Sequence, residues 1–156
     1  MKRGVASFLQ IMVVLTGIVV LVALLWEPRV EGVNANATSL YQIYFDDPFL
    51  AYIYFSFIAV FVGFYQTFKL LGFVGSDETY SQRSVQALRT IRYCALTFAG
   101  LIFLAVAYIM IIASRTSDDI AGGVAVGLFM IVVSLAIAAT TWMFERILQK
   151  VTAQTP

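Results

Sequence analysis

The chain has 156 residues, of which 61% are hydrophobic and only 12% are charged, and its formal net charge is +1. A soluble domain carries about 25% charged residues, so this chain has too few charges to cover a water-facing surface and is predicted to lie mostly in lipid. The near-neutral charge argues against nucleic acid as a partner, and the single cysteine, Cys94, excludes an intramolecular disulfide.

The first predicted membrane span covers residues 6–26 and follows the basic residues Lys2 and Arg3. A crossing of the hydrocarbon core takes about 20 apolar residues, and a signal-peptide core is shorter. We therefore expect an uncleaved transmembrane helix rather than a signal peptide. Trp26 is placed as an interfacial anchor, and Pro28 is predicted to end the helix because proline cannot continue its hydrogen-bond ladder.

An acidic and polar loop, residues 27–48, is expected next, and its segment 40–45 (LYQIYF) is strongly aromatic. This segment is interpreted either as an interfacial segment with rings at head-group depth or as a lid or docking segment for a partner. The second span is predicted over residues 49–71. Asp47 and Pro48 form a cap and first turn at its start, and Gly72 is expected at its end.

Residues 72–90 are predicted to form a cytoplasmic stretch that leads into the third span, residues 91–113. Thr79 and Gln82 have the spacing of a capping box, and Ser81 is a second candidate for the N-cap. Apolar residues then recur every third or fourth position, at Val85, Leu88, Ile91 and Ala95. This spacing is helical and predicts one helix that starts at the membrane surface and enters the bilayer.

The loop 114–119 is short, so the third span and the fourth, residues 120–144, should be antiparallel neighbours. Asp118 or Asp119 is expected to cap the fourth span. The predicted fold is therefore all-α: a single four-span domain over residues 1–156, arranged as an antiparallel transmembrane four-helix bundle.

The distribution of basic residues predicts the orientation of this bundle. With the N-terminus inside, eight of the ten basic residues lie on the inner side and two on the outer side. The eight are Lys2, Arg3, Lys69, Arg83, Arg89, Arg92, Arg146 and Lys150. Cytoplasmic loops carry an excess of Lys and Arg, so both termini of this multi-pass membrane protein are predicted to be cytoplasmic.

Two segments carry a family resemblance: residues 65–71 (YQTFKLL) and residues 80–95 (YSQRSVQALRTIRYCA). They resemble the bacterial membrane family Domain of Unknown Function 2975, and the DDIAG start of the last span is similar too. The resemblance covers essentially the whole chain, although many members continue into an acidic tail where this chain has residues 153–156. It implies a multi-pass protein of a bacterial inner membrane, with four spans and no established activity. Some members are encoded beside a small helix-turn-helix regulator, which implies a membrane partner for such a regulator.

Enzymatic chemistry finds little support in the residues. The chain has no histidine, so His-based acid–base pairs, triads and metal ligands are excluded. Cys94 has no histidine base and is interpreted as a small buried hydrophobe. The pairs Asp46-Asp47 and Asp118-Asp119 are interpreted as helix caps, with an outer divalent-cation site as the alternative. We predict no enzyme, no cofactor, no catalytic residue and no metal site.

Helix packing is predicted from small residues in the last two spans. Gly123 and Gly127 form a Gly-x-x-x-Gly pattern, and Ala95 and Ala99 form a similar strip on the third span. Small residues let membrane helices approach closely. Packing of the third span on the fourth within one chain is the favoured interpretation, and a homodimer interface is the alternative.

The candidate interaction residues are Arg83, Arg89, Arg92 and Glu145. Arg89 and Arg92 either reach lipid phosphates or contact Glu145, and we predict the contact. The predicted function is a non-enzymatic assembly, scaffold or regulatory partner acting through the cytoplasmic stretch, in the lipid bilayer with a protein partner or as a homo-oligomer. The alternative is an oligomeric transporter or channel subunit, which the charge-free spans disfavour.

Overall fold

The computed structural model describes residues 3–30, 36, 38–112 and 120–154. These residues form five helices and no strand: α1 (Arg3–Val30), α2 (Leu40–Phe45), α3 (Pro48–Gly75), α4 (Gln82–Ile112) and α5 (Ala121–Gln154). All but α2 are long and apolar enough to cross a membrane. The predicted all-α, four-span fold is confirmed.

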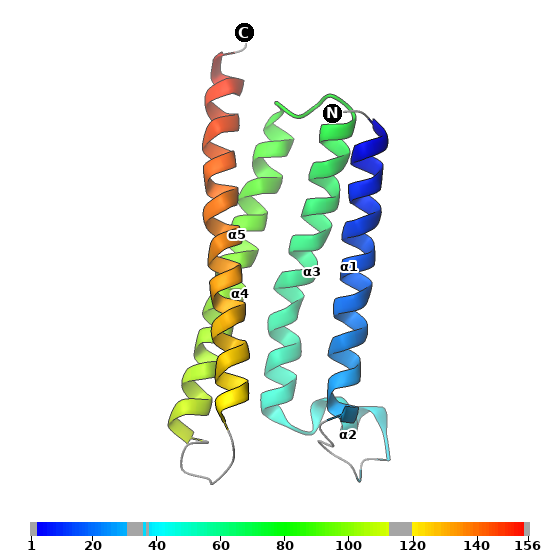
Figure 1. Ribbon diagram of the computed structural model, residues 1–156, viewed down its shortest axis with the longest axis vertical. Coiled ribbons are helices and arrows are strands. Elements are labelled where there is room, and N and C mark those ends of the chain that lie inside the picture. Colours follow the sequence, from blue (N-terminus) through cyan, green and yellow to red (C-terminus); the bar gives the residue numbers. More distant parts are fainter. Residues whose placement is uncertain (1–2, 31–35, 37, 113–119, 155–156) are drawn as a thin grey trace.

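The four long helices pack in chain order. The α1 helix contacts α3, α3 contacts α4, and α4 contacts α5, whereas α2 is a short helix against α3. Figure 1 shows neighbouring long helices antiparallel, with both chain ends at the same end of the molecule and α2 at the other. We call the end that holds the chain termini the terminal end.

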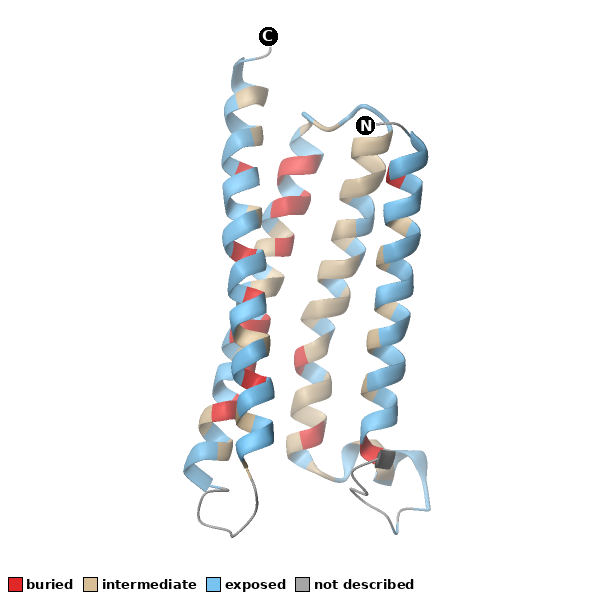
Figure 2. Ribbon diagram, in the orientation of Figure 1, coloured by how far each residue is buried: buried red, intermediate tan, exposed pale blue. Residues whose placement is uncertain are grey.

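Burial is concentrated on α4 (Figure 2). The buried side chains of Phe98, Ile102 and Val106 form the core, against which partly buried residues of α3 and α5 pack. By contrast, most side chains of α1 are exposed. In a bilayer these side chains face lipid, so their exposure is compatible with a stable helix.

The start of α3 follows the prediction, but its end does not. Asp47 is the N-cap: its Oδ1 accepts a hydrogen bond of 2.9 Å from the Phe49 backbone N–H, and Pro48 occupies the first turn. The helix continues past Gly72 and ends at Gly75, so Gly72 was wrong as its end. Asp77 then adopts the left-handed conformation, with φ of 62°.

The α4 helix begins at Gln82 and runs without a break to Ile112. The amphipathic segment and the predicted third span are thus one helix. Ser81 provides its cap, since the Ser81 hydroxyl accepts a hydrogen bond of 3.3 Å from the Ser84 backbone N–H. Thr79 precedes this cap by two residues, so the predicted capping box was wrong and the second candidate, Ser81, is the N-cap.

The α1 helix passes through Pro28 and continues to Val30, so the prediction that Pro28 ends it was wrong. Proline lacks the N–H that would bond the carbonyl four residues earlier, which is that of Leu24. The Tyr54 hydroxyl of α3 donates to this carbonyl at 3.1 Å, and the Tyr44 hydroxyl of α2 donates to the next one, Leu25, at 3.2 Å. Tertiary hydrogen bonds therefore replace the one that proline removes.

Some predictions fall on residues outside those described. These are the loop 114–119 with its caps Asp118 and Asp119, the terminal residue Lys2, residue 113 at the end of the third span, and part of the loop 27–48.

Candidate functional site

Basic residues gather at the terminal end of the molecule. In the described helices they are Arg3, Lys69, Arg83, Arg89, Arg92, Arg146 and Lys150. The opposite end carries Glu27, Asp46 and Asp47, together with Arg29 in the last turn of α1. The terminal end also holds Asp77 and Glu78, in the connection between α3 and α4. Because α3 and α5 end where α1 and α4 begin (Figure 1), residues far apart in sequence contribute to one basic surface.

A cluster of three charges joins α4 to α5 on this surface. Arg89 Nε donates a hydrogen bond of 3.0 Å to Glu145 Oε1, and Arg92 Nη1 lies 2.8 Å from Glu145 Oε2. Gln149, one turn further along α5, donates from Nε2 to Oε1 at 3.2 Å. The contact predicted between Glu145 and the two arginines is present. We call these four residues the charge cluster.

Burial differs sharply within the charge cluster. Glu145 is 4% exposed, whereas the Arg89 and Arg92 side chains are 49% and 19% exposed. Glu145 Oε2 has no hydrogen-bond partner among the described residues, so its 2.8 Å contact with Arg92 is an ion pair without hydrogen-bond alignment. A buried carboxylate is costly unless it is paired. The arginines therefore stabilise Glu145 in its buried position, and the pairing fixes α4 against α5.

Arg83, the fourth candidate, lies outside the charge cluster. It is exposed in the first turn of α4, and the connection before this turn contacts the end of α5. The Thr152 hydroxyl lies 3.4 Å from the Tyr80 carbonyl oxygen and donates more closely, at 2.8 Å, to Leu148.

Two of the four candidate packing residues, Gly123 and Gly127 of α5, lie against side chains of α4. Gly127 is buried, and a methyl group at this position would overlap the Val106 side chain. Ala99 is also buried. A methyl group at Gly123 would make an ordinary contact with Ile109, at 3.7 Å, whereas Ala95 is partly buried and lines a cavity. These contacts support packing within one chain.

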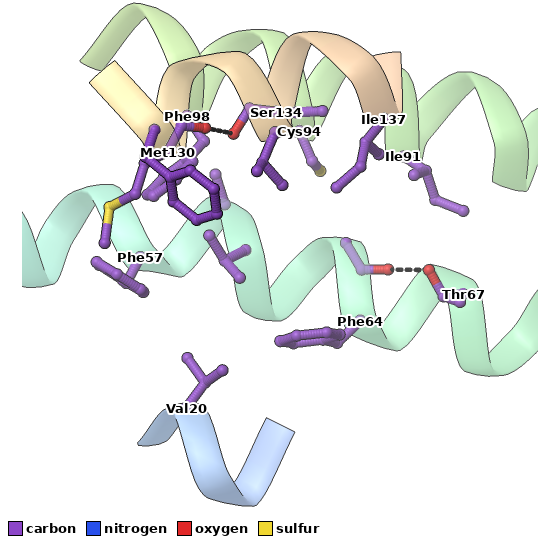
Figure 3. A pocket seen from close by; sticks show the side chains of 16 residues that line it. Val20, Phe57, Phe64, Thr67, Ile91, Cys94, Phe98, Met130, Ser134 and Ile137 are labelled. Carbon is purple, nitrogen blue, oxygen red and sulfur yellow. Dashed lines mark hydrogen bonds between the residues drawn. The ribbon is translucent and has the colours of Figure 1, made fainter. Parts of the chain in front are cut away.

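That cavity, of about 350 Å³, lies between α1, α3, α4 and α5. Figure 3 shows Val20 of α1 facing Phe64 of α3, with α4 and α5 on the other side. Sequence reasoning missed this cavity, because its lining comes from four helices with no shared motif. Sequence reasoning also missed Gln149. Gln149 lies four residues after Glu145, and this spacing indicates that the two side chains are neighbours on one helix.

The sequence matches the family described as Protein of unknown function (DUF2975) over residues 31–154. The chain belongs to this family. It is also 32% identical over 155 residues to a protein of Bacillus subtilis (strain 168) named Uncharacterized membrane protein YoaS. The aligned region covers 96% of this chain and 92% of that protein. No solved structure matches. This family membership agrees with the four membrane-crossing helices.

The site does not resemble a metal centre. Among the described residues, no group of three or more His, Cys, Asp or Glu could hold a metal ion. The Asp47 carboxylate caps α3, as expected from the preferred interpretation of the Asp46-Asp47 pair. The arrangement on the basic surface suits charge pairing and recognition of acidic groups.

Proposed function

We propose that this protein is a non-enzymatic scaffold or regulatory partner in a bacterial cytoplasmic membrane, and that its terminal end recognises an acidic protein segment. The charge cluster carries this proposal. It joins the start of α4 to the end of α5 through a buried carboxylate, so the surrounding basic side chains are presented by a fixed pair of helices.

The proposed orientation places this terminal end in the cytoplasm. Basic residues are retained on the cytoplasmic side of membrane proteins, and seven of them lie on described helices at this end. Arg146 stacks on the Trp142 ring, with its guanidinium carbon 4.3 Å from the ring centre. An aromatic ring paired with a cation is typical of the membrane interface, so the residues beyond Arg146 are expected in water.

Arg83 and Lys150 are the side chains best placed to meet a partner. Both are exposed, and both lie beyond the charge cluster towards the water-facing end of their helices. Arg89 is less suitable as a test position because it also holds Glu145. Charged residues at the rim of an interface mainly raise the association rate and select the partner. An acidic segment in a cytoplasmic protein would therefore be recognised by these two residues first.

The proposal can be tested by photo-crosslinking in intact cells, followed by purification and identification of the captured protein. The double variant Arg83→Glu/Lys150→Glu should lose at least nine-tenths of the captured partner. Arg3→Glu is the matched control, because Arg3 is an exposed basic residue at the same end on the distant helix α1. Equal loss in the control, or no loss in the double variant, would contradict the proposal.

The alternative, a transporter or channel subunit, is favoured by one observation: the cavity within the membrane-spanning helices. Its hydroxyl groups are directed to their own helices, however, since Thr67 donates to Gly63 and Ser134 donates to Met130. A path for polar solutes needs polar groups that face the path. Solute flux in reconstituted vesicles that is absent from protein-free vesicles would support this alternative.

A further inference from the structure

The cavity between the four long helices is lined almost entirely by apolar side chains. They include Val20 of α1, Phe57 and Phe64 of α3, Phe98 of α4 and Met130 of α5. These residues lie in the middle parts of helices that are long enough to cross a membrane. The cavity therefore lies at the depth of the hydrocarbon core of the bilayer, where water is scarce.

The few polar groups of the lining offer no site for a polar ligand. Figure 3 shows the Thr67 and Ser134 hydroxyls, each bonded to a backbone carbonyl of its own helix. The Thr67 bond to Gly63 is 2.9 Å long and the Ser134 bond to Met130 is 2.7 Å. With both donors engaged, the cavity provides an apolar surface alone. Water would find too few partners there.

The dimensions of the cavity select one kind of occupant. Its lining on α3 extends from Phe57 to Thr67, which is about 15 Å at 1.5 Å per residue. The volume of about 350 Å³ is the space open to the centre of a water molecule. Spread over this length, it corresponds to a groove roughly 8 Å wide between atom surfaces. An α-helix with its side chains is about 10–12 Å across and is too wide, whereas an acyl chain, whose carbons contact neighbours at about 4 Å, fits.

We propose that this cavity is a binding site for one acyl chain of a membrane phospholipid. The occupant fits the apolar lining, the width of a single chain and the depth within the bilayer. A helix from a second copy is too wide. This site is separate from the basic surface of the proposed function, and neither proposal depends on the other.

Native mass spectrometry of the full chain purified in a mild detergent tests this site. The probe is 1-palmitoyl-2-oleoyl phosphatidylglycerol, added back to delipidated protein. Wild-type protein should retain one phospholipid. Gly63→Leu should reduce retention at least tenfold, because a methyl group at Gly63 makes only an ordinary 3.8 Å contact with Cys94 and the rest of the leucine must occupy the cavity.

Gly100→Leu is the matched control, since Gly100 is exposed and has no atom within 4 Å of an added methyl group. It should retain the phospholipid. Val133→Phe fills the same cavity from α5 and serves if Gly63→Leu fails to fold, which its thermal unfolding would reveal. A wild-type protein without retained phospholipid, or folded cavity variants that retain it fully, would overturn the proposal. Retention of a prenyl lipid instead would overturn the phospholipid assignment.

Cys94 supplies a second measurement because it is the only cysteine in the chain and lines the cavity. Added phospholipid should slow alkylation of Cys94 by N-ethylmaleimide at least fivefold in the wild-type protein. The same addition should leave the rate unchanged in Val133→Phe. An unchanged wild-type rate would show that the acyl chain lies elsewhere on the protein.

Discussion

The first and last pairs of neighbouring long helices, α1–α3 and α4–α5, are stabilised in different ways. The α4–α5 pair is closely packed, with Gly127 of α5 against Val106 of α4, buried alanines on both helices (Ala99 and Ala138), and an ion-paired carboxylate that joins them. The α1 helix contacts α3 but is otherwise largely exposed. Its contacts with α3 include a close approach of Ala6 to Gly75 and hydrogen bonds to backbone carbonyls, such as the 3.1 Å bond from Gln10 Nε2 to Phe68.

This difference reflects how lipid changes the forces between helices. Lipid tails are as apolar as leucine, so burial of large side chains gives little drive for association. The α4–α5 pair gains dispersion contacts through close helix approach in the middle of its helices, as at Gly127. The α1 helix has such an approach near its start, at Ala6, and otherwise relies on a few hydrogen bonds worth about 0.6 kcal/mol each on average. We therefore expect α1 to separate first, and the variants below to affect the two pairs unequally.

Gly127→Leu should produce the largest effect. Even a methyl group at Gly127 would overlap Val106, so α5 must move away from α4. Overpacking costs about 1–3 kcal/mol, and we expect a loss of about 3 kcal/mol in the free energy of unfolding. Unfolding by sodium dodecyl sulfate in mixed micelles, followed by circular dichroism, measures this loss.

Gly122→Leu is the control for this variant, since Gly122 is exposed and has no atom within 4 Å of an added methyl group. Its unfolding should match that of the wild type. If both glycine variants lose equal stability, the cost comes from leucine itself and the close α4–α5 contact is not its cause.

Glu145→Ala should have the next largest effect. It leaves Arg92, whose side chain is 19% exposed, without its partner at the helix interface. Breaking a buried ion pair costs about 3–5 kcal/mol, but the partial exposure of both arginines reduces this penalty. We therefore expect Glu145→Ala to lower the free energy of unfolding by about 2 kcal/mol. The same detergent titration measures it.

The double variant Glu145→Leu/Arg92→Leu separates charge burial from packing. An apolar pair often replaces a buried ion pair at no cost, so this variant should regain at least half of the stability lost in Glu145→Ala. A double variant less stable than Glu145→Ala would mean that the ion pair itself is strongly stabilising.

The sequence predicted the α4–α5 pair better than the α1–α3 pair, for a physical reason. Small residues at a spacing of four indicate a helix interface directly, and so do opposite charges at the same depth in the membrane on two neighbouring helices. These two signals identified Gly127, Ala99 and the contact of Glu145 with the arginines. Tyr54 carries no such signal, because nothing in the sequence indicates which backbone carbonyl its hydroxyl reaches.

The end of α1 shows the same limit. The local rule that proline ends a helix predicts an end at Pro28, but the helix continues to Val30. The hydroxyl of Tyr54 donates a hydrogen bond to the Leu24 carbonyl, which proline leaves without its helical donor, and Tyr54 is thirty residues away from Leu24 in the sequence. The cavity was equally beyond sequence reasoning, since it depends on how four helices leave space between them. Local and periodic features were predictable, and features that depend on pairs of distant residues were not.

Tyr54→Phe tests the hydrogen bonding of α1. It removes the donor to the Leu24 carbonyl and should lower the free energy of unfolding by about 1 kcal/mol. In a Pro28→Ala background, residue 28 regains an N–H for this carbonyl, so Tyr54→Phe should cost less than half as much. Detergent titration of the four proteins completes this double-mutant cycle. Equal costs in both backgrounds would disprove the link between Tyr54 and Pro28.

Asp77→Gly should have the smallest effect and the opposite sign. Asp77 lies in the connection between α3 and α4 with φ of 62°, a conformation that favours glycine. The next residue, Glu78, donates its backbone N–H to the Phe73 carbonyl at 2.9 Å, which closes the end of α3 as in a Schellman motif. Glycine should keep this bond without the strain and stabilise the protein by about 0.5 kcal/mol.

Asp77→Ala is the control, because alanine keeps the steric cost of the left-handed conformation and removes the carboxylate. It should be no more stable than the wild type in the same titration. If alanine stabilises the protein as much as glycine, the carboxylate is unfavourable at this position, through repulsion by Glu78 or the carbonyls at the end of α3, and backbone strain is not the cause. The two substitutions thus separate charge from conformation at the link between the two helix pairs.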